Sequence, residues 1–288
     1  MKKVIVLGKS GMLGSKVFET FVAEKNINVF GTDRSILDAQ TVTTEKIESI
    51  IDGFDYIINC IGIIKPYIHD DNSFEVQRAI LVNGLFPHKL AAAAEKVGAK
   101  IIQIATDCVF DGVKGGYTEN DKHNPTDVYG KTKSLGEVVS PNVLNLRCSI
   151  IGKELKGKTS LLEWFINQPK NGIVKGFKNH LWNGVTTDAF AKLCLGIIKK
   201  EVWFSGLQHI VPSSIMSKAE MLKLFAEVFN RKDIIIEDTN ADISIDRTIS
   251  TINNVANSRL WKIADYEWIP TVEEMIKEIK QCEDLIRG

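Results

Sequence analysis

The chain has 288 residues, enough for one large α/β domain or two closely joined ones with a substantial core. Its 36 basic and 36 acidic side chains give no net charge, which argues against electrostatic capture of nucleic acid or of a membrane surface. The first apolar run, VIVL, ends at Gly8 and is too short for a signal peptide or a membrane span.

The first 150 residues alternate between short β-branched apolar runs and longer amphipathic stretches. The apolar runs predict strands over residues 3–8, 27–32, 55–62, 99–106 and 142–150. They are apolar almost throughout, as strands covered on both faces are. The stretches between them predict helices over residues 11–24, 44–51, 73–97 and 128–139. This order predicts an α/β fold with a doubly wound parallel sheet.

After Gly152 the pattern is less regular, with glycine-containing loops around KNGIVKGF and NHLWNGVTT. A second region therefore begins here. Two of its helices carry start signals, because Ser217-Lys-Ala-Glu220 and Thr271-Val-Glu-Glu274 both fit the capping box. No long linker or low-complexity segment separates the two regions, so we expect them to pack together.

The five cysteines are an odd number, widely spaced and mostly within apolar runs. This usage predicts reduced thiols in a cytoplasmic protein. The five histidines are scattered, and neither CxxC nor HxxxH occurs, so we expect no metal site.

The first predicted strand ends in GKSGMLG (8–14), a G-x-x-G-x-x-G turn that opens a helix. Such glycines let the backbone approach a pyrophosphate, whose charge is favoured by the free amides at the helix N-terminus. Glycines also simply end strands, but the position between a strand and an amphipathic helix favours nucleotide binding.

Asp33 follows the second predicted strand, about 20 residues after the glycine turn, where a carboxylate can hold the adenosine ribose hydroxyls. Arg34 comes next. The carboxylate favours NAD and the arginine favours the 2′-phosphate of NADP, so both cofactors stay open, with NADPH slightly preferred. A solvated loop with an ion pair is the alternative.

Tyr129 and Lys133 stand four positions apart at the start of a predicted helix, so they share one helix face. A single pair of this kind arises easily by chance in a chain with 36 basic residues. The context favours an active site, because Thr106 ends the fourth predicted strand and open parallel sheets bind ligands at that edge. We expect Thr106, Tyr129 and Lys133 to converge on the nicotinamide end of a dinucleotide.

The glycine turn, Thr106 and the YxxxK pair together resemble the extended short-chain dehydrogenase/reductase superfamily. The string TDCVFDGVKGGYTENDKHNPTDVYGKTKSLGE (106–137) resembles one branch, the dTDP-4-dehydrorhamnose reductase (RmlD-like) family of sugar-nucleotide reductases. VANSRL (255–260), NGVTT (183–187), LRCS (146–149) and Asn83 are similar to further positions of that family. The resemblance covers essentially the whole chain.

The resemblance implies a Rossmann-type NAD(P)-binding domain over residues 1–152 and a mainly substrate-binding region over 153–288, with elements near 183–210 returning to the first. It implies NAD(P)H-dependent reduction of the C4 ketone of a nucleotide-linked 4-keto-6-deoxyhexose, in cytoplasmic deoxysugar and surface-glycan synthesis. The sugar would be dTDP- or UDP-linked. Neither nucleic acid nor membrane would be a partner, and a homodimer stays open.

By the same resemblance, Thr106 would hydrogen-bond the substrate carbonyl oxygen and Tyr129 would protonate it. A tyrosine with a pKa of about 10 needs a positive charge nearby, which Lys133 would supply while it also bonds the nicotinamide ribose. The residues expected at the cofactor, besides Tyr129 and Lys133, are Gly8, Ser10, Gly11, Met12, Leu13, Asp33, Arg34, Asp38, Cys60, Ile61, Gly62 and Asn83.

The residues expected to wall the substrate cleft, besides Thr106, are Asp107, Cys108, Ser149, Trp182, Asn183 and Arg259. Arg259 would meet the diphosphate bidentately, with an ion pair that fixes the C-terminal region as the alternative. Trp182 would stack on a base or sugar, or else anchor its loop by packing.

The sequence departs from the resembled family at two positions that face the sugar. Cys108 stands where the family usually has tyrosine, and Ile150 where it usually has an aromatic residue. These smaller side chains leave room for a bulkier sugar, so a UDP-2-acetamido-2,6-dideoxy-hexulose is the alternative substrate. A non-catalytic regulatory subunit of the same fold and a 4-epimerase also stay open as functions.

Overall fold

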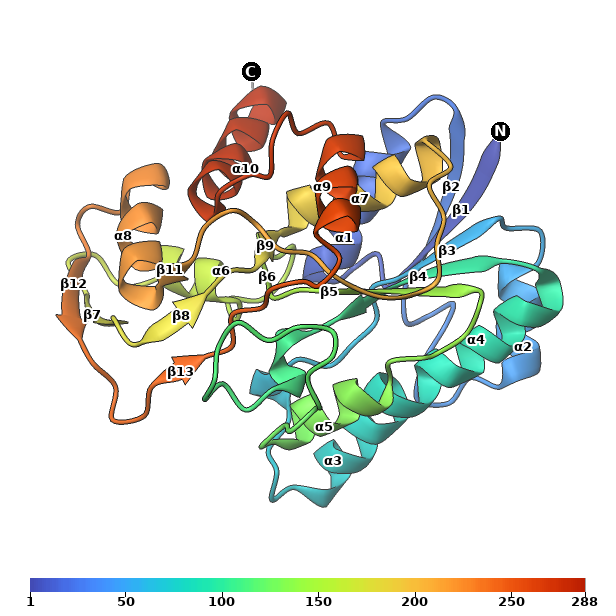
Figure 1. The fold of residues 1–288 in the computed structure, drawn as a ribbon, viewed down its shortest axis with the longest axis horizontal. Coiled ribbons are helices and arrows are strands. Elements are labelled where there is room, and N and C mark those ends of the chain that lie inside the picture. The colour runs from blue at the N-terminus through green and yellow to red at the C-terminus, as the bar shows by residue number, and fades with distance from the viewer. Residues whose placement is uncertain (288) are drawn as a thin grey trace.

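The computed structural model describes residues 1–287, and a six-stranded parallel sheet lies at its centre (Figure 1). The strand order is β10-β5-β4-β3-β1-β2. The strands are β1 (Lys2–Leu7), β2 (Ile27–Thr32), β3 (Tyr56–Asn59), β4 (Lys100–Ala105), β5 (Val143–Arg147) and β10 (Gly206–His209). This arrangement confirms the predicted α/β fold with a doubly wound parallel sheet.

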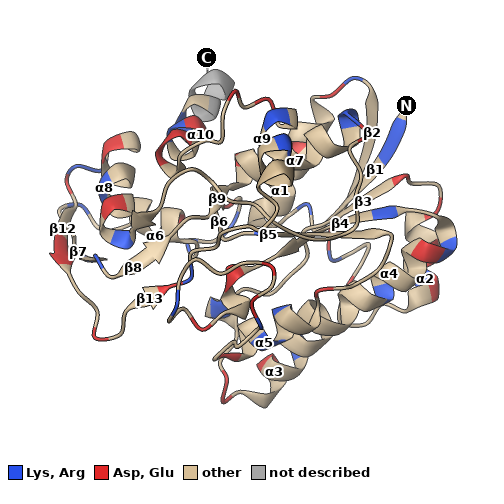
Figure 2. Cartoon of the chain, viewed as in Figure 1, with Lys and Arg blue, Asp and Glu red and all other residues tan. Residues whose placement is uncertain are grey.

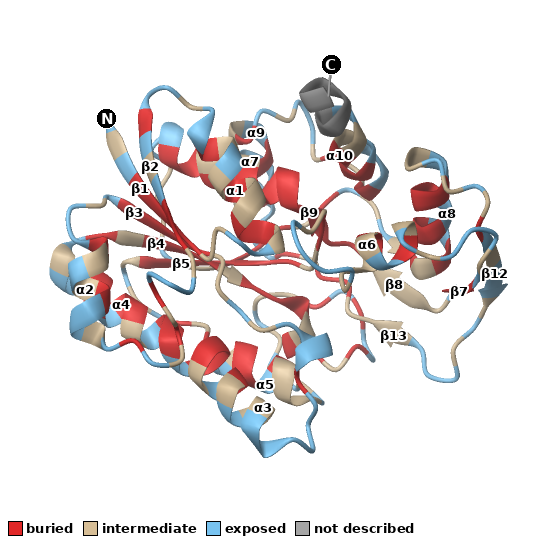
Figure 3. Cartoon of the chain, turned by 180° about the vertical axis from the view of Figure 1, so that it is seen from behind, coloured by how far each residue is buried: buried red, intermediate tan, exposed pale blue. Residues whose placement is uncertain are grey.

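Helices cover both faces of this sheet because successive side chains of a strand point to opposite sides. In β1, Val4 and Val6 belong to one apolar core with α1 (Met12–Val22) and α7 (Thr187–Lys199). Ile5 and Leu7 belong to a second core with α2 (Thr44–Ile51) and α4 (Phe86–Val97). The buried residues therefore run along the central strands and the inner faces of the helices (Figure 3).

The helix predicted over residues 73–97 contains a wider turn that the sequence did not indicate. It consists of α3 (Ser73–Ala79), the π-helix η2 (Ile80–Leu85) and α4. Such π segments often occur at functional sites. The helix predicted over 128–139 ends early, as α5 (Val128–Leu135), at Gly136. A Cβ at Gly136 would lie 1.9 Å from the Asn83 carbonyl oxygen, so η2 and the end of α5 approach at backbone distance.

The second region contains short strands where the sequence predicted loops. β7 (Ile173–Phe177) pairs with β12 (Ile235–Thr239), and β8 (His180–Trp182) lies between β11 (Met216–Ser217) and β13 (Ile245–Asp246). β6 (Ile150–Ile151) pairs with β9 (Val185–Thr186). The prediction of loops around KNGIVKGF and NHLWNGVTT was therefore wrong, because strands this short are stabilised by partners far along the chain.

The remaining elements are η1 (Lys65–Tyr67), η3 (Asp107–Val109), α6 (Leu161–Ile166), α8 (Lys218–Val228), α9 (Asn254–Ile263) and α10 (Val272–Arg287). Both predicted capping boxes are confirmed. The amide of Glu220 donates to Ser217 Oγ at 3.2 Å, and that of Glu274 donates to Thr271 Oγ1 at 3.1 Å.

Two late elements lie against the central sheet and its helices. β10 pairs with β5, and α7 packs against α1. The division of the chain into a cofactor-binding domain over residues 1–152 and a substrate-binding region over 153–288 stays a proposal.

Basic and acidic residues are interspersed along the part of the chain that is coloured by charge (Figure 2). No helix within residues 1–287 is long and apolar enough to cross a bilayer. Cys60, Cys108, Cys148 and Cys194 are free thiols, and the side chain of Cys282 lies outside the described residues.

Candidate active site

The glycine turn joins β1 to α1 at the carboxyl edge of the sheet. Gly8 has a φ of 81°, which favours glycine. The amides of Gly8 and Lys9 donate to the Thr32 carbonyl at 3.1 and 2.9 Å. A Cβ at Gly14 would lie 2.1 Å from the Gly8 carbonyl oxygen, so this tight turn requires glycine there.

The start of α1 has free amides that fit an anionic group. Its N-cap residue, Gly11, provides no side-chain hydrogen bond, whereas side chains cap α2, α3, α5, α6, α7 and α8. The first-turn amides of a helix have no partner within it, and its N-terminus carries a partial positive charge. A dinucleotide pyrophosphate therefore fits the turn that contains Ser10, Gly11, Met12 and Leu13.

The end of β2 carries groups suited to the adenosine end of a dinucleotide. Asp33 Oδ1 accepts from Ser35 Oγ at 2.6 Å and from the Ser35 amide at 3.0 Å. These bonds lower the pKa of Asp33. Arg34 is exposed beside it, and the charge of Lys9 also acts on Asp33. Asp38 closes a turn by accepting the backbone amide two residues on, at 3.0 Å.

The segment after β3 lies directly beside the glycine turn. The Cys60 amide donates to the Leu7 carbonyl at 3.1 Å, and a Cβ at Gly8 would lie 3.0 Å from the Ile61 side chain. Burial raises the pKa of the Cys60 thiol to about 12, so the thiol stays protonated. Gly62 follows at the surface, with the Asn83 side chain close by.

Asn83, which the sequence predicted at the cofactor, links this segment to α5. Its Oδ1 accepts the Ile63 amide at 2.8 Å, and its Nδ2 donates to the Ile63 carbonyl at 2.9 Å. Nδ2 also lies 3.4 Å from Thr132 Oγ1. The side chain thus positions the loop beside the glycine turn.

Thr106 and Tyr129 are brought together by the packing of α5 on the end of β4. Thr106 caps η3, because its Oγ1 accepts the Cys108 amide at 3.2 Å. Asp127 caps α5 by accepting the Gly130 amide at 2.8 Å. A Cβ at Gly130 would lie 2.2 Å from the Cys108 carbonyl oxygen, so α5 contacts this segment at backbone distance.

Tyr129 keeps its phenol proton in this structure. Burial raises the pKa of Tyr129, the neighbouring Cys108 adds to the rise, and a hydrogen bond with Thr106 opposes it. The phenol is therefore protonated at neutral pH. Lys133 Nζ donates to the Ile104 carbonyl at 3.1 Å, and burial lowers the pKa of Lys133 while Glu137 raises it. The sequence-based expectation that Lys133 lowers the pKa of Tyr129 stays a prediction for the enzyme with its cofactor.

The predicted substrate residues that lie beside Thr106 are Asp107, Cys108 and Ser149. Burial raises the pKa of Asp107, and the charge of Arg247 and hydrogen bonds with Thr106 and Ser149 oppose the rise. Trp182 lies close to Ser149, because a Cβ at Gly184 would meet both the Trp182 ring at 2.3 Å and the Ser149 carbonyl oxygen at 2.4 Å.

The other two residues predicted to wall the substrate cleft are Asn183 and Arg259. The Asn183 side chain is buried and holds the backbone of Ile249, donating to its carbonyl at 2.7 Å and accepting its amide at 2.9 Å. Arg259 lies on the exposed face of α9, which packs against α7 and β10. Within residues 1–287, no hydrogen bond or ion pair joins Arg259 to the group around Thr106.

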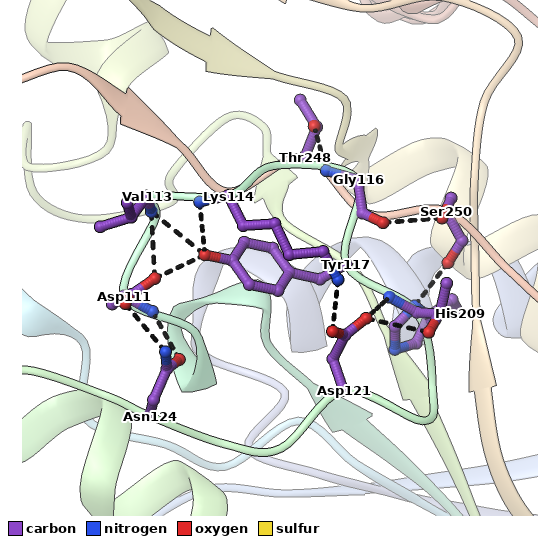
Figure 4. Close-up of polar contacts among 11 residues, drawn as sticks. Asp111, Val113, Lys114, Gly116, Tyr117, Asp121, Asn124, His209, Thr248 and Ser250 are labelled. Atoms are coloured by element: carbon purple, nitrogen blue, oxygen red, sulfur yellow. Dashed lines mark hydrogen bonds and ion pairs between the residues drawn. The ribbon is translucent and has the colours of Figure 1, made fainter.

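Residues 110–117 bind the segment that follows β13, a connection that the sequence did not reveal (Figure 4). The Gly116 amide donates to Thr248 Oγ1 at 3.0 Å, and the Tyr117 amide donates to the Thr248 carbonyl at 2.9 Å. The Ser250 amide donates to the Tyr117 carbonyl at 2.8 Å. We call residues 110–117 with residues 246–250 the clamp.

The clamp brings Arg247, a residue missed by the sequence analysis, close to the end of β4. Its Nε donates to the Phe110 carbonyl at 2.9 Å and its Nη2 to the Asp111 carbonyl at 3.3 Å. The only signal in the sequence was a basic residue in an irregular polar stretch, which does not distinguish a site from a solvated loop.

Behind α5, the fully buried Arg147 of β5 connects three acceptors. It donates to both carboxylate oxygens of Glu137, to His209 Nε2 at 2.8 Å and to His123 Nε2 at 2.6 Å. Arginine only donates, so both Nε2 atoms accept. Each Nδ1 then carries the proton: His209 Nδ1 donates to the Ser250 carbonyl at 2.7 Å, and His123 Nδ1 to Ser134 Oγ at 2.7 Å.

Both histidines are thereby held neutral. Burial lowers the pKa of His123 and of His209, and the charge of Arg147 lowers both further. Glu137 opposes the change at both rings, and Glu119 opposes it at His209. The hydrogen bonds around Arg147 therefore hold α5 in place only while the rings of His123 and His209 are uncharged. This helix carries Tyr129 and Lys133.

Acid is expected to destabilise the fold through His123 and His209. Their folded pKa lies below the unfolded value of about 6.5, so their stabilisation is complete above about pH 6.5 and is lost as the pH falls through the folded pKa. Each histidine contributes a slope of up to about 1.4 kcal/mol per pH unit. Urea unfolding between about pH 7.5 and about pH 5.5 measures this loss.

The matched variants for this test are His209→Gln and His69→Gln. His209→Gln should flatten the slope, whereas His69→Gln should retain it, because His69 is exposed and pairs with Glu75. Comparing how steeply the free energy of unfolding changes with pH in each variant cancels the contributions of titratable groups that all variants share. An equal slope in both variants would contradict the role of the Arg147 network.

A turn that fits a pyrophosphate and a protonated tyrosine share one edge of a parallel sheet, an arrangement typical of the extended short-chain dehydrogenase/reductase class. Comparison with known proteins specifies the branch. The chain belongs to the RmlD substrate binding domain family, whose model matches residues 1–280.

Two relatives and one solved structure illustrate the range of similar proteins. The dTDP-4-dehydrorhamnose reductase of Aggregatibacter actinomycetemcomitans is 35% identical over 156 residues, which are 52% of this chain and 51% of that protein. The chain thus matches about half the length of that relative. Methionine adenosyltransferase 2 subunit beta of Rattus norvegicus is 29% identical over 246 residues, 80% of this chain and 72% of that one.

The solved structure is that of dTDP-4-dehydrorhamnose reductase from Bacillus anthracis in complex with NADP. It has a TM-score of 0.79 and 19% identity, with all of both chains covered. At 19% sequence identity, this structural similarity shows that the two proteins share a fold, and it shows nothing more.

Proposed function

We propose that this protein uses NADPH or NADH to reduce the C4 ketone of a nucleotide-linked 4-keto-6-deoxyhexose. The observation that carries the proposal is the contact of α5 with the end of β4, which puts the protonated Tyr129 beside Thr106. The uncapped start of α1 at the same sheet edge fits the cofactor's pyrophosphate. The similarity to a dTDP-4-dehydrorhamnose reductase over half of the chain supports the sugar class.

In this mechanism the bound nicotinamide supplies a hydride to the ketone carbon. Thr106 Oγ1 donates its single hydrogen to Asp107 Oδ1 at 3.2 Å in this structure, and with substrate bound it would turn that hydrogen to the ketone oxygen and orient it. Tyr129 gives its proton to that oxygen, which completes the alcohol. Lys133 then stabilises the tyrosinate with its positive charge and bonds the nicotinamide ribose.

The cofactor preference depends on the end of β2. The carboxylate of Asp33 suits the ribose hydroxyls of NADH, whereas Arg34 and Lys9 suit the 2′-phosphate of NADPH. Because Arg34 and Lys9 carry two positive charges and Asp33 only one negative charge, this end of the site favours NADPH slightly. The NADP complex of the Bacillus anthracis reductase is consistent with this preference.

The identity of the sugar is less well defined than the reaction at its C4 ketone. Cys108 lies beside Tyr129, where the resembled reductases usually have a tyrosine. Cys108 and Ile150 are smaller than the residues usual in that family and leave room for a bulkier sugar, such as one with a 2-acetamido group. A UDP-2-acetamido-2,6-dideoxy-hexulose is therefore the alternative substrate.

The test is a panel of 4-keto sugar nucleotides that varies the base and the C2 substituent, with NADPH and NADH each followed by absorbance. We expect stoichiometric oxidation of NADPH with at least one member and slower oxidation of NADH. Turnover without net consumption of either cofactor would indicate a 4-epimerase and contradict the proposal.

A second candidate function is a non-catalytic regulatory subunit, as the relative named methionine adenosyltransferase 2 subunit beta suggests. The presence of Thr106, Tyr129 and Lys133 together argues against it, because a binding subunit does not need all three residues of the reductase chemistry. Retention of the NADPH absorbance with every sugar nucleotide of the panel, together with tight NADPH binding, would favour this candidate.

A further inference from the structure

His123 connects the two ends of the segment that carries the proposed acid, Tyr129. It lies in the loop of residues 118–127, between the clamp and α5, where no helix or strand forms. Its Nδ1 donates to Ser134 Oγ in the last turn of α5 at 2.7 Å, and its Nε2 accepts from Arg147 of β5 at 2.6 Å. One imidazole thus joins the chain before Tyr129, the helix end after it and the central sheet.

The position of α5 depends on such contacts because the helix is short. Its eight residues, Val128–Leu135, would not form a stable helix on their own. At its start, the Asp127 carboxylate pairs with Lys65, whose side chain is 61% exposed, and the Asp70 carboxylate accepts the Val128 amide at the surface. Exposed contacts of this kind contribute little. The last turn is therefore the end of α5 that is held by hydrogen bonds shielded from water.

The clamp encloses His123 on a further side. The Phe110 ring meets the His123 ring edge-on, with 5.8 Å between the centroids, and the Arg147 guanidinium lies 5.2 Å from the centroid of the same Phe110 ring. Tyr117 stacks on Phe110 at 4.3 Å. The imidazole is thus confined between the clamp, Arg147 and Ser134. A displacement of this ring either moves the last turn of α5 or breaks the bond with Ser134.

The last turn of α5 also carries the positive charge that the proposed reaction needs. Lys133 precedes Ser134, and Tyr129 lies one turn before Lys133 on the same helix face. The glycine contacts of α5 allow close packing, but apolar packing has no direction and does not fix the rotation of a helix. Reacting groups must be held closely in place, because a displacement of about 1 Å can lower a rate by about 10²-fold.

We propose that His123, in its neutral form, is a positioning residue that keeps Tyr129 and Lys133 in register for the reduction. The inference rests on the proposed function. His123 acts through Ser134 and Arg147 on the helix that carries the acid, and not on the ketone itself. Arg147 has further acceptors besides His123, so the distinct contribution of this ring is its bond to Ser134.

Protonation of His123 would disturb this arrangement. The charged groups that face its ring are Arg147 on β5 and Glu137 after α5, whose Oε2 lies 3.6 Å from Nε2. A protonated Nε2 would be a donor opposite the donors of Arg147 and would turn toward Glu137. Burial lowers the pKa of His123, Glu137 opposes this change and Arg147 adds to it. The neutral ring therefore persists above the folded pKa, which lies below about 6.5, and is lost as the pH falls through that pKa.

Three variants of the full chain test the link. His123→Ala removes both hydrogen bonds of the ring, and Ser134→Ala removes only the bond to α5. His123→Gln can retain both, because its amide accepts from Arg147 and donates to Ser134, and it does not titrate. His69→Ala is the matched control, because His69 is exposed and pairs with Glu75.

Steady-state kinetics with the 4-keto sugar nucleotide that the panel identifies gives the first readout. We expect His123→Ala and Ser134→Ala to lower kcat by about tenfold without changing KM or the dissociation constant of NADPH, and His123→Gln to restore most of kcat. From about pH 7.5 to about pH 5.5, kcat should fall more steeply in the wild-type protein than in His123→Gln. Asp107 and the other titrating groups are common to both proteins, so this comparison cancels them. His69→Ala should match the wild-type protein throughout.

The second readout requires no reaction. A carbon isotope label at Cζ of the five tyrosines gives one NMR signal for each, and the signal of Tyr129 is the one that Tyr129→Phe lacks. We expect this signal to shift in His123→Ala and in Ser134→Ala. With falling pH it should shift in the wild-type protein and not in His123→Gln. Such shifts would support the positioning role even if no sugar of the panel were reduced, so failure of this inference and failure of the proposed function are distinguishable.

Ser134→Ala carries the test if His123→Ala does not fold, which the unfolding midpoint of each variant decides. Wild-type kcat with an unmoved Tyr129 signal in Ser134→Ala would overturn the proposal. Equal losses of kcat in His123→Gln and His123→Ala would assign the effect to the packing of the ring and overturn it as well. A loss confined to NADPH affinity would make His123 a support of the cofactor site and contradict the positioning of the acid.

Discussion

Replacement of Tyr129 by phenylalanine is expected to lower turnover by about 10²- to 10⁴-fold, the usual contribution of general acid–base catalysis. The change removes only the hydroxyl, whose proton the mechanism delivers to the ketone oxygen. The ring and the packing of α5 on Cys108 are retained, so NADPH should bind nearly as in the wild-type protein. Steady-state NADPH oxidation gives the turnover, and fluorescence titration gives the dissociation constant of NADPH.

Tyr266→Phe is the matched control for this variant. Tyr266 donates its hydroxyl to the carboxylate of Glu278, and it lies between α9 and α10, away from the end of β4. It should keep wild-type turnover. Turnover of Tyr129→Phe within a few-fold of wild type would contradict the role of Tyr129 as the acid, and a large loss of NADPH affinity would indicate a cofactor-binding role instead.

The parts of the fold that the sequence predicted are those with strong local signals. The apolar runs of β1 to β5 and the capping boxes at Ser217 and Thr271 depend on neighbouring residues, and all of them are present. The small strands β7, β8 and β13 have at most five residues each and pair with segments far along the chain, which a local pattern does not reveal. The π-helix η2 lies at backbone distance from Gly136, and no local pattern in the sequence indicated it.

The same distinction applies to the residues proposed for the site. Thr106, Tyr129 and Lys133 could be selected because a strand end and a four-residue helical spacing are readable from sequence. Arg247 could not, because only the clamp between residues 110–117 and 246–250 brings it close to the end of β4. The sequence suggested Arg259 because of its guanidinium and its place in VANSRL. Its exposure depends on which face of α9 packs against α7, and the sequence does not show that.

Loss of the buried Arg147 is expected to destabilise the protein strongly. Arg147→Met should lower the free energy of unfolding by about 3–5 kcal/mol, because it leaves the Glu137 carboxylate without its bidentate partner inside the protein. It also removes the donors that hold His123 and His209 in their neutral forms. Urea unfolding at neutral pH measures the change.

The double variant Arg147→Met/Glu137→Gln decides whether the buried charge causes the loss. The amide that replaces the Glu137 carboxylate carries no charge to desolvate, so the double variant should be more stable than Arg147→Met alone. Lys277→Met breaks the exposed pair with Glu273 and should leave stability close to that of the wild-type protein. If the double variant were as unstable as the single one, lost packing and the two unpaired histidines, rather than the carboxylate, would account for the effect.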